Sequence, residues 1–236
     1  MGLHVDEKRA CKRFLADFVE HGRDPTWGFY VYATYTRPQE QKEADSDQNS
    51  SSDKTAVVDD NTYFQNLLDK FHDLATEDLR DSYPVKYNQR IVDALRLVPA
   101  AIMPNASLSE VCTHFRTHHA RILESERLYE PGYQDAWNEE GLFGPKYEWC
   151  MVIDDEVLES FDADDDYYTF AKLLDGDYTK MKKPVALTAK YRDGTGGTQW
   201  NGWFKFSAGM LRNVFEVVHD NTYTTYFNGE DELLDF

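Results

Sequence analysis

The chain has 236 residues, 41% of them hydrophobic and 14% aromatic, so it can bury a substantial core without disulfide or metal support. It carries 43 acidic residues against 25 Lys and Arg, which gives a formal net charge of -18 at pH 7. A field of this sign repels phosphate backbones and anionic bilayers, so we expect neither a nucleic-acid partner nor a membrane partner.

The cysteines and the N-terminal residues indicate the compartment. Cys11, Cys112 and Cys150 are scattered and show no CxxC spacing, so neither a disulfide framework nor a zinc knot is expected. The first twenty residues are charged and amphipathic, unlike a signal peptide, and no stretch is long and apolar enough to span a bilayer. We therefore expect a cytoplasmic or nuclear protein with reduced thiols.

The N-terminal part of the chain predicts a helix, a strand, an insertion and a second helix. Residues 5–21 place Ala10, Phe14 and Phe18 at helical spacing. Residues 27–36 are aromatic and β-branched on both faces, which predicts a central strand. Residues 39–60 are polar and rich in Ser and Asp, which indicates a flexible insertion. Asp60 and Asn61 then suit the N-cap of a helix.

The C-terminal part alternates between the two kinds of element. Residues 89–98 fit a strand or a helix, and we interpret them as a strand because Pro99 follows. Ser107 is expected to cap a helix to about residue 125, and Asp154 with Asp155 to cap a short helical turn after a strand at residues 148–153. The remaining expected elements are strands at 168–174, 185–192 and 202–206, a turn at 193–197 and a helix at 208–218.

This order of elements predicts the fold class. Helices and strands are interleaved, but the strands end in a hairpin. We therefore expect one α+β domain over residues 1–236, with a mixed, largely antiparallel sheet and helices packed on it.

A pair of histidines is the candidate metal site. His114 and His118 lie one helical turn apart, which is a spacing used by metal ligands, but the glutamate of an HExxH motif is missing. His118 also belongs to the apolar stripe of its helix, which favours a structural role. Both interpretations stay open.

Other motifs fail on residue type. A calcium loop starting at Asp162 would need Gly at Tyr167 and Glu at Leu173, so a solvated acidic loop is expected. The glycines at residues 193–197 are flanked by strand patterns, which indicates a hairpin turn rather than a phosphate loop. No nucleophile elbow, nucleotide loop or kinase signature is present, so we expect no cofactor, and catalysis stays an open question.

Three segments resemble a family. Residues 27–34, 149–158 and 170–174 resemble elements of a group of uncharacterised filamentous-fungal proteins, whose shorter members lack the insertion at 39–60. The resemblance implies a fungal, intracellular origin and provides no activity and no catalytic residues.

Two functional hypotheses follow. The first is a non-enzymatic interaction protein of unknown partner, which predicts an exposed apolar patch. The second is a small-molecule carrier or cofactor-independent enzyme of specialised metabolism, which predicts a concave pocket. Its pocket would be lined by Tyr30, Tyr32 and Trp149, together with His114 or His118. The absence of a recognisable reaction centre favours the first.

Overall fold

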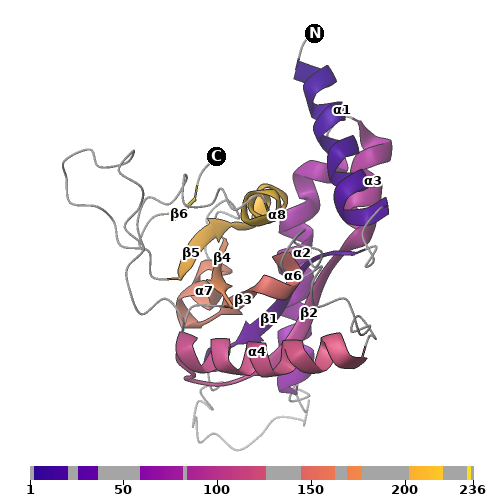
Figure 1. Cartoon of the computed structure of the whole chain (residues 1–236). Coiled ribbons are helices and arrows are strands. Elements are labelled where there is room, and N and C mark those ends of the chain that lie inside the picture. The colour runs from indigo at the N-terminus through magenta and orange to yellow at the C-terminus, as the bar shows by residue number, and fades with distance from the viewer. Residues whose placement is uncertain are drawn as a thin grey trace, which may run out of the picture.

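The computed structural model describes residues 3–20, 26–36, 59–81, 84–125, 145–162, 169–176, 202–219 and 233–234. These residues form one six-stranded sheet with helices on both faces (Figure 1). The strands are β1 (Trp27–Ala33), β2 (Leu95–Ile102), β3 (Trp149–Ile153), β4 (Phe170–Asp175), β5 (Trp203–Ser207) and β6 (Leu233–Leu234). The helices are α1 (Leu3–Phe14), η1 (Leu15–Glu20), α2 (Asp60–Asp81), α3 (Val85–Ala94), α4 (Leu108–Ser125), α6 (Pro145–Glu148), α7 (Asp155–Ser160), η5 (Ala208–Met210) and α8 (Leu211–His219).

The strand directions divide the sheet into two parts. The order is β2-β1-β3-β4-β5-β6, and β1 pairs in parallel with both β2 and β3. β4 is antiparallel to β3 and to β5, and β6 is parallel to β5. The expected mixed sheet is confirmed, and among the described strands antiparallel pairing joins β3, β4 and β5.

Two hydrophobic clusters lie on opposite faces of the sheet. The larger cluster joins residues of α1, α2, α3, α7 and α8 to one face of the sheet, and the smaller one joins α4 and Tyr147 to the other face. All seven residues of β1 are buried. A strand covered on both faces must be apolar throughout, so the prediction of a central strand at this position is confirmed.

Gly28 permits close contact between β1 and β2. Its φ is +124°, and a Cβ atom there would lie 2.2 Å from the carbonyl oxygen of Arg96. Any other residue would therefore combine an unfavourable backbone conformation with a backbone clash.

Helix caps explain where three elements begin. Asp59 accepts hydrogen bonds from the backbone N–H groups of Asn61 and Thr62 at 3.0 Å, so α2 is capped one residue before the predicted position. Ser107 and Glu110 form a reciprocal capping box at α4, and Asp154 accepts from the N–H of Val157 at α7. The caps predicted at Ser107 and at Asp154 are confirmed.

One element was predicted wrongly, and some lie outside the described residues. Residues 89–98 are not a single strand: α3 continues to Ala94, and β2 begins at Leu95 and passes through Pro99. Residues 37–58, which hold most of the expected insertion, lie outside the described part of the chain, as do the strand and turn expected over 185–197.

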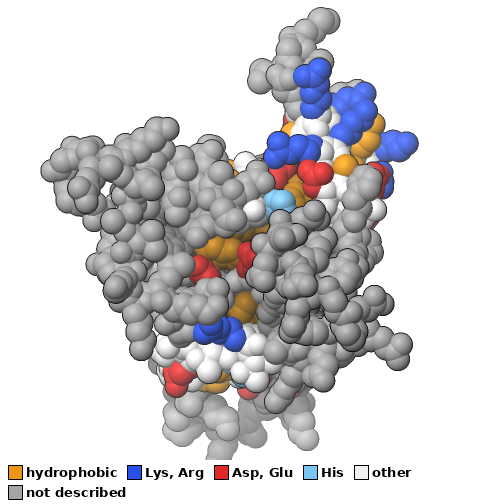
Figure 2. Space-filling view, viewed as in Figure 1, with side chains coloured by type: hydrophobic (Ala, Val, Ile, Leu, Met, Phe, Trp, Pro, Cys, Tyr) orange, Lys and Arg blue, Asp and Glu red, His pale blue; other side chains and the backbone are white. Residues whose placement is uncertain are grey.

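α1 and α3 pack against each other at one end of the molecule (Figure 1). The buried thiol of Cys11 donates to Oδ1 of Asn88 at 3.0 Å, and Nζ of Lys12 lies 5.6 Å from the ring centre of Tyr87. Figure 2 shows Lys and Arg side chains gathered over this end of the molecule.

Candidate functional site

β2 is the outermost strand at one end of the sheet. One edge pairs with β1, and no described strand pairs with the other edge. An unpaired edge carries backbone N–H and C=O groups that can receive another strand. Pro99 lies within this strand, and proline is tolerated in sheets mainly on edge strands, where its missing N–H is not needed.

The directions of the backbone groups along β2 follow from its contact with Gly28. The carbonyl oxygen of Arg96 faces β1, because it lies where a Cβ atom of Gly28 would be. Backbone groups of successive residues in a strand point to opposite sides, so the N–H and C=O of Leu97 and the C=O of Pro99 point to the free edge. The carbonyl oxygen of Leu95 accepts from Nη1 of Arg96 at 2.6 Å.

Two hollows lie between α2 and this edge. The larger has a volume of about 470 Å³ and the smaller about 280 Å³, and Gln65 lines both. Consecutive residues of β2 line each hollow, Leu95 to Leu97 in the first and Pro99 to Ile102 in the second. Side chains alternate between the faces of a strand, so a run of consecutive residues means that the strand edge itself borders the hollows. We call the two hollows together the α2–β2 groove.

The larger hollow is polar and carries both signs of charge. Arg80 and Asp73 form an ion pair with 2.9 Å between Nη2 and Oδ1, and Arg96 donates through Nη1 to the carbonyl oxygen of Asp93 at 2.9 Å. Burial, followed by the nearby charge of Arg80, lowers the pKa of His72, so this imidazole is neutral at pH 7. The hollow therefore offers two guanidinium groups, a neutral imidazole and carboxylates to a ligand.

The smaller hollow is mainly apolar. Besides Asn61 and Gln65, it is lined by Phe64 of α2 and by Pro99, Ala100, Ala101 and Ile102 of β2. Small side chains on β2 leave this space open, and Phe64 closes it from the helix side. An apolar side chain of moderate size fits such a space.

Tyr30, Tyr32 and the two histidines lie together on the face of the sheet that α4 covers. Both tyrosines are buried, whereas His114 is exposed on α4. A hydrogen bond of 3.2 Å joins Oη of Tyr32 to Nδ1 of His114, and the rings of Tyr30 and His118 meet edge to face at 5.9 Å. Burial, with smaller contributions from Cys150 and Tyr30, raises the pKa of Tyr32, so its hydroxyl keeps its proton.

Trp149 does not join this group. It belongs to the larger cluster on the opposite face, where its ring centre lies 5.9 Å from that of Phe204. Tyr30 and Tyr32 belong to the smaller cluster. The residues that the sequence suggested as the lining of a ligand pocket therefore lie on two opposite faces of the sheet.

His114 and His118 lie side by side as the helical spacing predicts. Their ring centres are 6.1 Å apart and their planes differ by 20°. Within the described residues, no group of three or more His, Cys, Asp or Glu side chains is arranged to hold a metal ion. A metal at this pair would need its further ligands from elsewhere, so the metal site stays a prediction.

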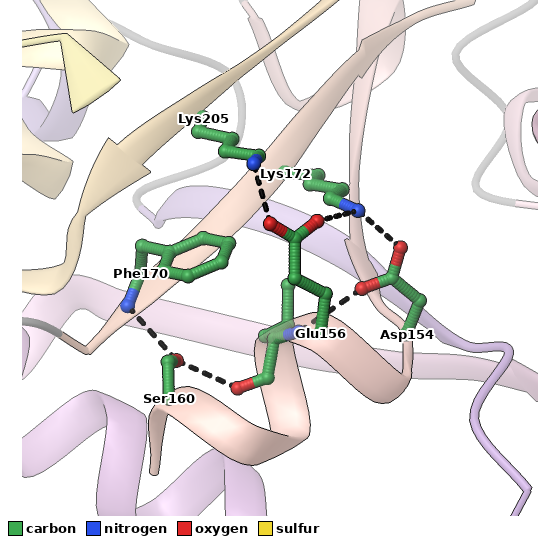
Figure 3. A network of polar contacts seen from close by, with 7 residues as sticks. Asp154, Glu156, Ser160, Phe170, Lys172 and Lys205 are labelled. Carbon is green, nitrogen blue, oxygen red and sulfur yellow. Dashed lines mark hydrogen bonds and ion pairs between the residues drawn. The ribbon is translucent and has the colours of Figure 1, made fainter. Parts of the chain in front are cut away.

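A second polar cluster, which the sequence did not suggest, ties α7 to the antiparallel strands (Figure 3). Glu156 accepts from Nζ of Lys172 at 2.7 Å and from Nζ of Lys205 at 2.5 Å, and Asp154 also pairs with Lys172. Burial alone would raise the pKa of Glu156, but its hydrogen bonds to the lysines outweigh this and lower it. Likewise, burial alone would lower the pKa of Lys172, but its hydrogen bonds to the acids raise it. Two cations and two anions balance here, which is typical of a structural ion network.

The α2–β2 groove was missed because its parts are far apart in the sequence. Gln65 and His72 belong to α2, whereas Leu95 to Ile102 belong to β2. One signal was available: an apolar stretch with a proline in its middle is typical of an edge strand.

Comparison with known proteins gives no relationship to argue from: no family model, curated protein or solved structure matches the chain. In the part of the chain that the structure describes, no helix is both long enough and apolar enough to cross a membrane.

Proposed function

We propose that this chain is a non-enzymatic interaction protein that binds an extended peptide segment of a partner as an added strand along β2. The α2–β2 groove carries the proposal, because its hollows lie between a helix and the free edge of a sheet. In this mode of recognition, backbone hydrogen bonds hold the peptide and pockets select its side chains. An intracellular setting and a fungal origin belong to the same proposal.

The lining of the groove indicates the chemistry of the peptide. An apolar side chain would enter the hollow between Phe64 and Ile102, and an acidic group would reach Arg80 and Arg96 in the other hollow. The N–H and C=O of Leu97 supply backbone pairing between these two ends. The expected ligand is thus a short extended segment with an apolar residue and an acidic residue.

Peptide selection tests the proposal. A phage-displayed library of random peptides of about twelve residues would be selected on the full chain, and enriched peptides titrated by calorimetry. Leu97→Pro removes the outward N–H, and Leu97→Ala is the matched control that keeps it. Because one hydrogen bond contributes about 1 kcal/mol, Leu97→Pro should bind about fivefold more weakly than Leu97→Ala. Failure to enrich any peptide, or equal binding by the two variants, would contradict strand addition.

The larger hollow also favours a second candidate, a small polar ligand. Its volume of about 470 Å³ lies within the range of small-molecule pockets, and charged groups of both signs converge on it. A thermal-shift screen of amino acids, organic acids and nucleotides tests this candidate. A hit that is lost in Arg96→Ala and kept in Leu97→Pro would favour the small ligand over the peptide.

A further inference from the structure

Six cationic side chains lie on the two helices at one end of the molecule. Lys8, Arg9, Lys12 and Arg13 belong to α1, and Lys86 and Arg90 belong to α3. On α1 they form two pairs one turn apart, so they share one side of the helix. We call these six residues the α1–α3 basic patch, and Figure 2 shows cationic side chains over this end of the molecule.

The patch rests on a fixed support. The hydrogen bond between Cys11 and Asn88 is buried and joins α1 to α3. Phe14, one turn beyond, meets Trp27 of the central strand edge to face at 5.1 Å. α1 is therefore packed against the core and joined to α3, so the backbone positions that carry the cations are fixed relative to one another.

Most of the cations in the α1–α3 basic patch have no ion-pair partner among the described residues. Arg13 pairs with Asp17 at 3.8 Å, and Arg90 pairs with Glu20 at 2.7 Å. Within the described residues no ion pair engages Lys8, Arg9, Lys12 or Lys86. Lys12 lies over the ring of Tyr87, and none of the four has a carboxylate partner in the described part of a chain whose formal net charge is -18.

An apolar side chain lies at the start of α3, beside Lys86. Val85 is 55% exposed. Among the described residues, it is the large hydrophobic side chain that lies on the surface. Interfaces combine a small apolar contact with a charged rim, so Val85 gives the patch a contact that is independent of charge.

We infer that the α1–α3 basic patch docks an acidic peptide segment of a partner protein, with an apolar residue of that segment on Val85. Charge complementarity supports this class of partner, since four cations on these two helices have no carboxylate partner among the described residues. This surface is distinct from the α2–β2 groove, and the inference stands whether or not the groove binds a peptide.

The net charge of the chain favours a short segment over a larger anion. A bilayer or a duplex extends well beyond the patch and would meet the acidic remainder of the surface, which repels it. A second copy of the chain would also carry a charge of -18. A short peptide stays within the patch, and at physiological salt the screening length of about 8 Å weakens its repulsion by more distant acids.

Fluorescence anisotropy with a labelled peptide tests the inference. The probe is a Glu-rich peptide of about ten residues with one central Leu. Arg9→Gln with Lys86→Gln removes two charges from the patch, and Thr113→Glu with Thr117→Glu makes the same net change on exposed positions of α4. The patch variant should bind about five- to tenfold more weakly, and the control within about twofold of the wild type. Val85→Ser should weaken binding about threefold and leave its salt dependence unchanged.

Several results would overturn the inference. These are no binding of the peptide by the wild-type chain, equal losses in the patch and control variants, and tighter binding to phosphatidylserine vesicles or to a DNA duplex than to the peptide. A dimer in sedimentation velocity that the patch variant abolishes would assign the surface to a second copy instead. Circular dichroism melting of each variant confirms that it is folded, and the five substituted positions are exposed, so folding should be kept.

Discussion

Lys172 of β4 and Lys205 of β5 are direct cross-strand neighbours, and both side chains are buried. Two cations facing each other on adjacent strands repel, so the pair depends on the carboxylate of Glu156 between them (Figure 3). The ammonium groups also lie over aromatic rings, Lys172 over Trp203 and Lys205 over Phe170, each at 5.4 Å.

We predict that Glu156→Gln destabilises the fold by about 1–2 kcal/mol. Removing one partner of a buried ion pair is costly, but Glu156 is half exposed, and water replaces part of what is lost. Urea unfolding measures the change. Glu159→Gln, on the same short helix and exposed, makes the same charge change and should cost less than about 0.5 kcal/mol. Equal effects of the two variants would contradict a specific role for Glu156.

The same cluster predicts how stability depends on pH. The pKa of Glu156 is lowered in the folded chain, so its contribution is present above the unfolded pKa, about 4.3, and is lost as pH falls through the lower folded value. The pKa of Lys172 is raised, so its contribution is present below about pH 10.4 and is lost as pH rises through the higher folded value.

Protonating the many acidic residues of the chain also relieves their mutual repulsion, which changes the stability of the wild type and the variant alike. The informative quantity is therefore the difference between their free energies of unfolding. The free energy of unfolding of the wild type minus that of Glu156→Gln should be constant between about pH 5 and 10 and shrink below about pH 4.3. Urea unfolding across this range measures it. A difference that does not shrink in acid would show that Glu156 carries no charge-dependent stability.

Gly28→Ala should destabilise the chain by about 3 kcal/mol or more. The substitution adds a Cβ atom 2.2 Å from the Arg96 carbonyl oxygen at a φ of +124°. Thermal or urea unfolding measures the loss, and reduced protection of β1 and β2 in hydrogen exchange would locate it. A variant with wild-type stability would contradict the close approach of these two strands.

The hydrogen bond between Tyr32 and His114 should contribute about 1 kcal/mol. A double-mutant cycle with Tyr32→Phe and His114→Ala isolates it, because each variant removes one partner. A coupling energy near zero would mean that water satisfies the exposed imidazole as well as Tyr32 does.

If His114 and His118 hold a metal, His114→Ala and His118→Ala should each abolish binding of a stoichiometric ion. Native mass spectrometry of the purified chain, compared with its denatured mass, provides the measurement. A wild-type chain without metal, or retention of metal by both variants, would remove the metal hypothesis and leave the pair as a helix-packing feature.

The sequence predicted those elements whose pattern lies within a few neighbouring residues. The apolar stretch at residues 27–36 and the acidic cap at Asp154 each depend on neighbouring residues, so they were visible. The edge position of β2 depends on pairing between distant segments, and so does the α2–β2 groove. The α1–α3 basic patch likewise joins Arg9 to Lys86, which no local window contains.

The central position of β1 also has a consequence for the order in which the chain folds. β1 is made first among the described strands, but its partner β2 follows about 70 residues later and β3 about 120 residues later. At a synthesis rate of about 5–20 residues per second, this aromatic strand remains without its neighbours for several seconds. Such long-range parallel pairing is slow to form, so until β2 and β3 are made β1 is an unpaired apolar strand of the kind that promotes aggregation.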